Sequence, residues 1–311
     1  MTGGADGINF IINKKNIDFT ILLKDILLNY CHVSFQTADS GIDLIESYIT
    51  YLDSSNYDPD QIKGGLKAPS NTAEVAELLN ITQSLKYFRV LSILGEGNNY
   101  SDQLASTLTQ LKSLIEEGIE VKNISSKAFF ATNIGTDYFA EMAKIRALRL
   151  LVAQFLKDQS VEIHPSDIYV HCNSIVFAND NYAPHGNMIK DATAVMAGIL
   201  GGCNSMDVIP EDVNNVMQSR IARNVSNILK EESYLNKVAD PVAGSYYIGS
   251  LTAMLANKAW KQFTGKEQIE VTLTKETDDI SFKKWLTAEK IEVSPIISEV
   301  DIDKAEHLEF S

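Results

Sequence analysis

Few residues in this chain have the types and spacing that chemistry requires. The three cysteines, Cys31, Cys172 and Cys203, form an odd, sparse set without the spacing of a disulfide framework. We expect reduced thiols that serve mainly as small buried hydrophobic side chains. The five histidines are spread along the 311 residues and suggest no metal site.

A dense group of turn-forming residues lies within Arg220–Thr252. Asp240-Pro241 is expected to stop one helix, and Gly244 permits a backbone turn that a Cβ would resist. Ser245 can cap the next helix by accepting a bond from a backbone N–H. Each of these residues alone is typical of a turn between two helices, so their chemistry is first of all structural.

Short apolar runs alternate with helical patterns along most of the chain. Strands are expected at Gly7–Ile12, His32–Thr37, Phe88–Gly95, Lys127–Ile134, Ile168–Phe177 and Ser205–Pro210, with one short strand within the loop-like Asp60–Ser70. Helices are expected at Phe19–Tyr30, Gly41–Leu52, Thr72–Leu85, Tyr100–Glu117, Tyr138–Lys157, Met188–Leu200, Arg220–Glu232 and Tyr246–Phe263. Such units of about 30 residues predict parallel strands with helical crossovers. Alternation alone does not separate a closed barrel from an open doubly wound sheet.

The pattern changes after Gly265. The run V-T-L-T-K-E is expected to be an edge strand, Ser281–Lys290 a short helix and Glu299–Ser311 an extended tail.

Composition narrows the class of protein. A length of 311 residues that is 45% hydrophobic is ample for one large core. A net charge of −14 argues against nucleic acid and anionic membranes as partners, and a polyanionic ligand would need a local basic pocket. No apolar run is long enough to span a bilayer, and no signal peptide begins the chain. We expect a cytoplasmic protein.

Five segments together carry a family resemblance: Gly4–Phe10, Ala128–Leu151, Val170–Ser174, Met196–Asp212 and Arg220–Thr252. In this order they resemble the barrel domain of the methylmalonyl-CoA mutase family, and the V-x-P-x-D ending after Met206 is more typical of its small, or beta, subunit. Gly249 departs from the glutamate usual in the family. The resemblance implies an α/β fold, a (β/α)8 TIM-type barrel over residues 1–265, a C-terminal extension at 266–311 and no cobalamin-binding domain. Family members carry a substantial region before the Gly4–Phe10 strand, which leaves open whether the barrel is complete at its N-terminal side.

The chemistry of the family uses adenosylcobalamin to convert methylmalonyl-CoA to succinyl-CoA, and the cofactor performs the difficult steps. Family members ligate cobalt through a histidine in a D-x-H-x-x-G motif of a separate domain. This motif contains none of the histidines of this chain, which are His32, His164, His171, His185 and His307. We therefore expect the chain alone to bind no adenosylcobalamin.

The resemblance also implies degenerate site positions. Tyr100 and Ser101 align with the catalytic Tyr-His pair, and a serine hydroxyl cannot replace an imidazole as a charged donor. The same two residues could simply cap a helix. Tyr169 stands where catalytic members carry a substrate-binding arginine, while His171, Asn173 and Asn204 match polar positions that would contact substrate.

Two arginines on the helix Tyr138–Lys157, Arg146 and Arg149, are more typical of salt bridges than of ligand contacts.

Three functions remain open. The first is a non-catalytic small subunit, inactive alone, that forms a heterodimer with a large catalytic subunit, or a homodimer in its absence. The second is a catalytically competent acyl-CoA mutase barrel that uses a cobalamin domain supplied in trans. The third is an unrelated aldolase-like or phosphate-binding barrel, for which Gly201-Gly202 is the only candidate loop.

Overall fold

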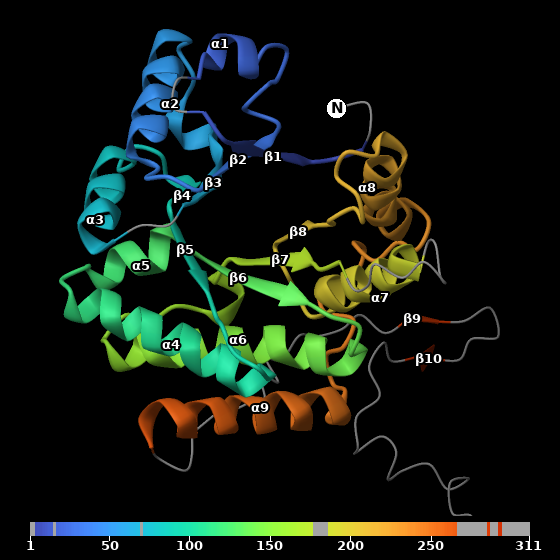
Figure 1. Ribbon diagram of the computed structural model, residues 1–311. Coiled ribbons are helices and arrows are strands. Elements are labelled where there is room, and N and C mark those ends of the chain that lie inside the picture. Colours follow the sequence, from blue (N-terminus) through green and yellow to red (C-terminus); the bar gives the residue numbers. More distant parts are fainter. Residues whose placement is uncertain are drawn as a thin grey trace, which may run out of the picture. The chain divides into compact units, whose positions relative to one another are not determined.

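The computed structural model describes residues 4–14, 17–68, 71–176 and 186–265, together with two short strands at 285–286 and 292–293 (Figure 1). The chain divides into two units, residues 1–269 and residues 270–311, which are taken one at a time.

The first unit contains two parallel sheets in which every strand pairs with its neighbour in sequence. The first sheet has the order β1-β2-β3-β4 and the second β5-β6-β7-β8. Their bounds are β1 Gly7–Ile12, β2 His32–Thr37, β3 Lys63–Lys67, β4 Tyr87–Arg89, β5 Leu91–Leu94, β6 Ala128–Ile134, β7 Val170–Ser174 and β8 Ser205–Asp207. A consecutive order with helical crossovers differs from a doubly wound sheet, whose order reverses at a switch point.

The two sheets are joined through one continuous stretch of chain. The predicted strand Phe88–Gly95 is interrupted at Val90, whose N–H donates to the carbonyl of Lys127 (3.2 Å) instead of continuing the β3–β4 ladder. At the other ends of the sheets, Asn9 of β1 donates to Asp207 of β8 (3.4 Å). Among the described residues no backbone ladder connects β1 with β8.

Helices follow the strands in the same alternation. They are α1 Phe19–Leu22, α2 Ile42–Ser54, α3 Thr72–Ile81, α4 Tyr100–Glu116, α5 Val121–Lys127, α6 Tyr138–Asp158, α7 Gly186–Leu200, α8 Val216–Glu231 and α9 Tyr246–Thr264. Two 3₁₀ turns lie at Pro59–Gln61 and Pro165–Asp167.

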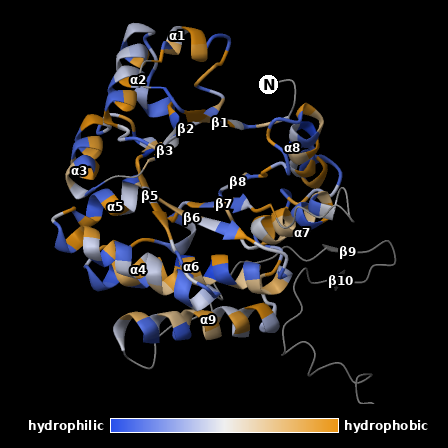
Figure 2. Cartoon of the chain, in the orientation of Figure 1, coloured by the Kyte–Doolittle hydropathy of each residue, from blue (hydrophilic) through white to orange (hydrophobic). Residues whose placement is uncertain are grey.

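Helix starts and faces have local causes. Asn71 and Glu74 form a capping box at the start of α3, and Ser245 caps α9 as expected. On α4 the buried residues include Leu104, Leu108 and Leu111, which lie on one face of the helix at i, i+4 and i+7. Figure 2 shows the resulting mixture of hydrophobic and hydrophilic residues along α4 and α9.

The hydrophobic core lies between the strands and their helices. An aromatic group connects β2, α2 and β4, with the Phe35 and Tyr48 ring centroids 5.0 Å apart and those of Tyr48 and Phe88 5.6 Å apart. All three side chains are fully buried. Since each aromatic ring removes a large apolar area from water, this group stabilises the first sheet against its helices.

Some predicted elements differ from the structure, and one helix was not predicted. The helix expected at Phe19–Tyr30 ends at Leu22, because Asp25 takes a left-handed conformation with φ of 64° that a helix cannot include. The helix α5 was not expected, because its short sequence lacks a clear apolar period. The strand expected at Ile168–Phe177 covers only Val170–Ser174, and Phe177 lies outside the described residues.

In the second unit the structure describes one antiparallel pair, β9 (Trp285–Leu286) with β10 (Glu292–Val293). The helix expected at Ser281–Lys290 is therefore wrong at residues 285–286, where backbone pairing overrides a weak helical pattern. The expected edge strand V-T-L-T-K-E and the tail Glu299–Ser311 lie outside the described residues. Within the described part of the chain, no helix combines the length and apolar character needed to cross a membrane.

Candidate functional site

Polar side chains from both sheets of the first unit meet in one place. We call this group the central polar cluster; it consists of Asn9, Lys67, His171, Asn173, Ser205 and Asp207. Lys67 comes from the first sheet, and its Nζ lies 2.7 Å from His171 Nε2 and 3.4 Å from Asp207 Oδ2 of the second sheet. The cluster thus links the two sheets through side chains.

Strand alternation and register explain why these residues meet. His171 pairs with Ser205 and Asn173 with Asp207 between β7 and β8, so four polar side chains share one face. Lys67 is the last residue of β3, at the carboxyl end of the strand. Parallel strands bring their carboxyl ends to the same edge, which is where functional residues of such folds gather.

The charges in the cluster perturb one another. Burial alone would raise the pKa of Asp207, but the hydrogen bond and charge of His171 and the ammonium of Lys67 outweigh it and hold that pKa below its ordinary value. Burial lowers the pKa of Lys67, and Asp207 only partly offsets this effect. The cluster is therefore an ion pair with hydrogen bonds around it, and both charges are already compensated.

Both ring nitrogens of His171 have partners. Its Nδ1 lies 2.7 Å from Ser205 Oγ, and its Nε2 lies 2.9 Å from Asn173 Oδ1 and 2.7 Å from Lys67 Nζ. The imidazole is 7% exposed. An imidazole held on both sides in this way is oriented but has no nitrogen available for a further ligand.

Tyr169 precedes β7 and contacts a guanidinium. The Cζ of Arg89 lies 4.3 Å from the centre of the Tyr169 ring, a cation–π arrangement. Arg89 comes from β4, so a cation is present beside Tyr169 although the strand of Tyr169 itself carries none. Burial lowers the pKa of Arg89, and the nearby Tyr169 opposes that shift.

Asn204 does not join the central polar cluster. Its Oδ1 accepts from the N–H of Val170 (2.8 Å) and from Arg149 Nη2 (2.7 Å). Arg149 also donates to the carbonyls of Pro165 (2.9 Å) and Gly202 (2.5 Å). Arg149 and Asn204 thus fix the chain before β7 and β8, and the substrate role of Asn204 remains a prediction that these contacts do not favour.

Arg146, in contrast, binds Asp240 in the turn before α9, with Nη1 2.8 Å from Oδ2. This pair is the salt bridge expected for Arg146.

Tyr100 and Ser101 are the first residues of α4, and their contacts are with residues outside the central polar cluster. Ser101 is 1% exposed and donates to Asn99 Oδ1 (2.7 Å), the side chain that caps the helix. Burial together with the carboxylates of Glu141 and Asp137 raises the pKa of Tyr100. The cap is therefore Asn99, and Ser101 supports it.

Sequence reasoning missed a buried ion pair beside Tyr100. Lys144 and Glu141 are 2.6 Å apart with 2% and 3% of their side chains exposed. Glu141 also accepts from the N–H of Gly135 (2.7 Å), and Lys144 donates to the carbonyl of Asn133 (2.6 Å). Since every charge here has a backbone partner, the pair holds the loop after β6 against α6. Sequence reasoning also missed Lys67, Asp207 and Arg89. The signal that could have indicated them was a charged residue within a predicted strand or at its end.

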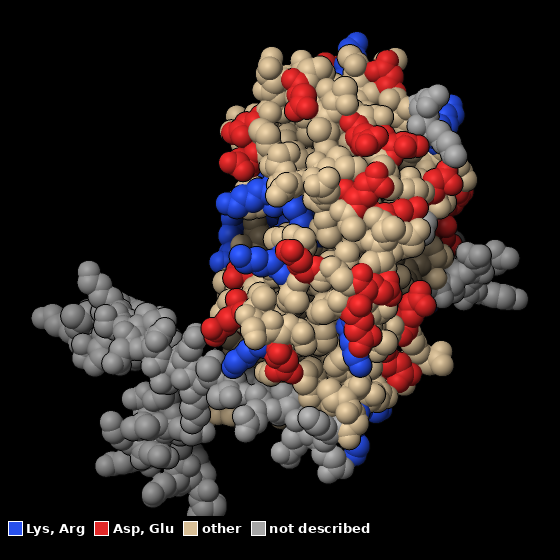
Figure 3. All heavy atoms as spheres, turned by 90° about the vertical axis from the view of Figure 1, so that its left-hand side faces the viewer, with Lys and Arg blue, Asp and Glu red and all other residues tan. Residues whose placement is uncertain are grey.

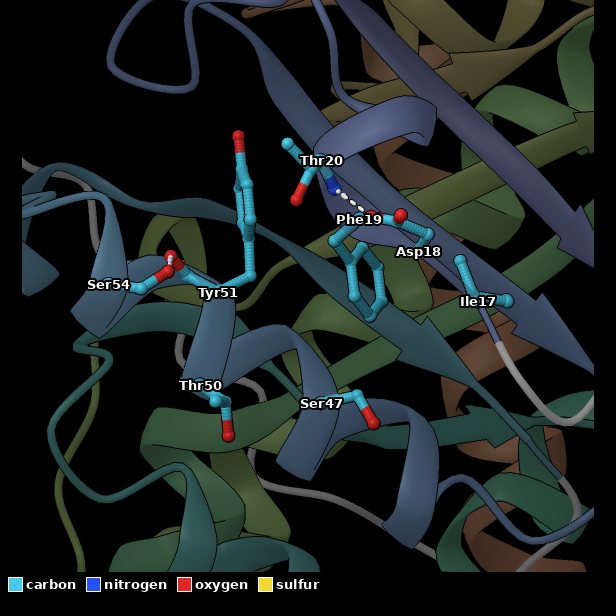
Figure 4. Close-up of a pocket in the computed structure, with 8 residues that line it drawn as sticks. All are labelled: Ile17, Asp18, Phe19, Thr20, Ser47, Thr50, Tyr51 and Ser54. Atoms are coloured by element: carbon cyan, nitrogen blue, oxygen red, sulfur yellow. Dashed lines mark hydrogen bonds between the residues drawn. The ribbon is translucent and has the colours of Figure 1, made fainter.

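The surface of the first unit is hollowed in places. One hollow, of about 350 Å³, lies between the start of α1 and the outer side of α2, where hydroxyl and aromatic side chains surround it (Figure 4). Asp18 in this hollow already accepts from the N–H of Thr20 (2.9 Å). On another face, Figure 3 shows lysine and arginine side chains gathered around a hollow, although acidic side chains prevail elsewhere on that face.

The fold and site define a class: parallel β/α units whose strand ends carry a polar, internally satisfied cluster. The sequence profile of the methylmalonyl-CoA mutase family matches residues 91–270. The chain belongs to this family.

Named relatives agree with the profile. The chain is 29% identical to a methylmalonyl-CoA mutase small subunit of Porphyromonas gingivalis, over 93% of this chain and 52% of the relative. It is 32% identical to a small subunit of Streptomyces virginiae, over 54% of this chain and 28% of that relative. It is also 31% identical to the large subunit of Porphyromonas gingivalis, over 60% of this chain and 28% of that relative. The chain spans about half the length of the first of these relatives.

Adenosylcobalamin, the cofactor of the family, is ligated in other members through a D-x-H-x-x-G motif, and none of the described histidines lies in such a motif. His171 has partners at both ring nitrogens, and His164 Nδ1 lies 2.7 Å from Ser166 Oγ in a surface turn. The described residues also contain no group of His, Cys, Asp and Glu that could hold a metal ion. We therefore derive no step through the cofactor from this chain.

Proposed function

We propose that this chain forms the barrel part of a methylmalonyl-CoA mutase small subunit, a non-catalytic partner that stabilises a large catalytic subunit. In the complex, the large subunit would hold adenosylcobalamin and convert methylmalonyl-CoA to succinyl-CoA. The proposal includes a cytoplasmic location and a heterodimer.

The observation that carries this proposal is that the polar side chains of the candidate site are hydrogen-bonded or ion-paired to other groups of the chain. Lys67, His171 and Asp207 compensate one another, and Ser101 is engaged with Asn99. A catalytic acid, base or nucleophile must instead offer a group to the substrate. Side chains that bond only to each other are what a structural subunit requires.

We further propose that the two sheets are arcs of a (β/α)8-type barrel. The consecutive strand order and the side-chain contact between Asn9 of β1 and Asp207 of β8 support this arrangement. A barrel removes the exposed strand edges that would otherwise invite aggregation.

Co-elution tests the partner role. The chain and the large subunit from the same source are mixed at micromolar concentration and separated by size-exclusion chromatography. We expect one peak that contains both chains. Separate elution of the two chains at this concentration would overturn the proposal, whereas elution of the chain as a dimer in the absence of the large subunit would agree with the homodimer expected then.

An absorbance titration with adenosylcobalamin tests the cofactor assignment. We expect no spectral change with the chain alone, because none of its histidines lies in a D-x-H-x-x-G motif, and saturable binding in the presence of the large subunit. Saturable binding by the chain alone would contradict the assignment.

Two observations favour the alternative, a barrel that still binds an acyl-CoA and works with a cobalamin domain in trans. The guanidinium of Arg89 beside Tyr169, and the basic hollow of Figure 3, are features that an anionic ligand would use.

Turnover of the reconstituted complex decides between the structural subunit and this alternative. We expect Ser101→Ala and Tyr169→Phe to leave turnover within about twofold, since neither hydroxyl would act in a structural subunit. A loss of 100-fold or more in either variant, with the complex still assembled, would favour the alternative.

A further inference from the structure

Two of the three cysteines lie together, although they are 31 positions apart in the sequence. Cys172 is fully buried on β7, and Cys203 is half-buried in the turn between α7 and β8. Each of the two thiols lies close enough to shift the pKa of the other. Cys203 Sγ and Cys172 Cβ both approach the position that a Cβ at Gly198 of α7 would take, at 3.8 and 3.9 Å.

The backbone holds Cys203 in this position from both sides. Its N–H donates to the carbonyl of Gly198 (3.0 Å), and the following residue, Asn204, donates to the carbonyl of Val170 (2.8 Å). Gly202 makes the intervening turn with a φ of 88°. The backbone therefore holds Cys203 beside the strand that carries Cys172.

The surroundings of the two thiols differ. The neighbouring Cys172 thiol, and after it the guanidinium of Arg149, lower the pKa of Cys203 despite burial. Burial raises the pKa of Cys172. Reactive thiols are those that a nearby cation turns into thiolates, so Cys203 is the more nucleophilic of the pair.

We propose that Cys172 and Cys203 form a peroxide-sensitive dithiol, in which Cys203 is oxidised first and Cys172 converts it to a disulfide. The Cys203 thiolate attacks one oxygen of a hydroperoxide, the O–O bond breaks, and a sulfenic acid and hydroxide result. Cys172 sulfur then attacks Cys203 sulfur, the S–S bond forms, and the sulfenic oxygen leaves as water with the proton of Cys172. Two thiols lose two electrons in total, and hydrogen peroxide becomes two molecules of water.

The consequence concerns the strand that carries the candidate site. Cys172 lies between His171 and Asn173, whose side chains belong to the central polar cluster on the opposite face of β7. The disulfide would tie the turn before β8 to β7 directly behind that cluster. This inference goes beyond the proposed function and holds whether or not the chain binds a large subunit.

The full chain is treated with hydrogen peroxide, free thiols are alkylated, and peptides are mapped by mass spectrometry without reduction. We expect a peptide pair linked through Cys172 and Cys203, formed at least about tenfold faster than any oxidation of Cys31. Cys31 is the internal control, because it is buried and its pKa is raised by burial. Recovery of both thiols by a dithiol reductant is also expected.

Two serine variants test the order in which the cysteines react. In Cys172→Ser, Cys203 should stop at the sulfenic acid, which a dimedone-type reagent labels, and Cys203→Ser should show neither label nor disulfide. Alkylation of Cys172 and Cys203 at the same rate before and after peroxide would overturn the inference. So would conversion of Cys203 in the unaltered chain to the sulfinic acid without a linked peptide.

Discussion

Lys67 carries its ammonium from the end of β3 in one sheet to His171 and Asp207 in the other. A lysine on the inner side of two sheets loses hydration, which lowers its pKa, and it stays charged because a carboxylate lies opposite. The residue therefore does two things at once: it compensates Asp207, and it connects two sheets whose backbones share no ladder among the described strands.

We expect Lys67→Met to lower the free energy of unfolding by about 1–2 kcal/mol, because Asp207 would lose its cation while partly exposed to water. Urea unfolding measures the difference. The pH dependence of this stability follows from Asp207. Because its pKa is lowered in the folded chain, the ionised carboxylate adds stability above about pH 4, and this contribution is lost as the pH falls further. The difference between the two proteins should therefore shrink below about pH 4. Lys63→Met, an exposed change on the same strand, is the control and should stay within about 0.5 kcal/mol.

Asp191 on α7 offers a test of opposite sign. Its side chain is 5% exposed, and burial raises its pKa to about 6. A carboxyl group with a raised pKa adds stability below its unfolded value near 4 and loses it as pH rises through 6. We expect Asp191→Asn to be more stable than the original chain by about 2–3 kcal/mol at pH 8 and about equal to it below pH 4. Equal stability at both pH values, by urea unfolding, would contradict the raised pKa.

Among whole elements, β3 shows how a glycine decides strand pairing. Gly64 has a φ of 155°, and a Cβ there would lie 1.7 Å from the backbone oxygen of Val33 on β2. We expect Gly64→Ala to cost about 3 kcal/mol or more, since backbone cannot move aside without breaking the β2–β3 ladder. Gly118→Ala is the matched control, because a Cβ there meets nothing within 4 Å and only the φ of 97° resists it. Thermal unfolding of both variants checks the contrast.

At Gly249 on α9 we expect alanine to raise the stability of the chain rather than lower it. The residue lies inside the first turns of the helix, and a Cβ there would meet nothing within 4 Å. We expect Gly249→Ala to stabilise the chain by about 0.5–1 kcal/mol, because alanine loses less backbone entropy in a helix. A lower unfolding temperature in differential scanning calorimetry would show that the glycine has a packing role.

Most elements could be predicted from sequence because their signals are local. The apolar face of α4, the cap at Ser245 and the β2 strand depend on spacing within a few residues, and the structure confirms them. The ends of elements were harder: α1 stops because Asp25 turns left-handed, and β4 separates from β5 because Val90 bonds to Lys127. Both endings depend on contacts that spacing does not contain.

The candidate site was only half visible in sequence for the same reason. His171 and Asn173 share one strand, so alternation placed them together. Lys67 and Asp207 join them across 140 positions, and no local pattern indicates that contact. Tyr169 was expected to replace an arginine, and its own strand carries none, but Arg89 brings a guanidinium beside it from a different strand.

At the scale of the whole molecule, the net charge does not show where the cations lie. The net charge of −14 makes the surface acidic overall, yet the cations that matter lie inside or in hollows. We expect association with a large subunit to depend on complementary charges at the contact surface. A higher salt concentration should therefore change the affinity only if such basic hollows are part of the interface.

The consecutive strand order has a consequence for synthesis on the ribosome. Each of the strands β1 to β4 pairs only with strands next to it in sequence, and the same holds for β5 to β8. A growing chain can therefore complete each pairing as soon as the next β/α unit has emerged, without holding an earlier strand unpaired for a later one. Side-chain contacts across the unit form later: those of Asn9 and Lys67 with Asp207 require β8, and that of Asp6 with Lys230 requires α8.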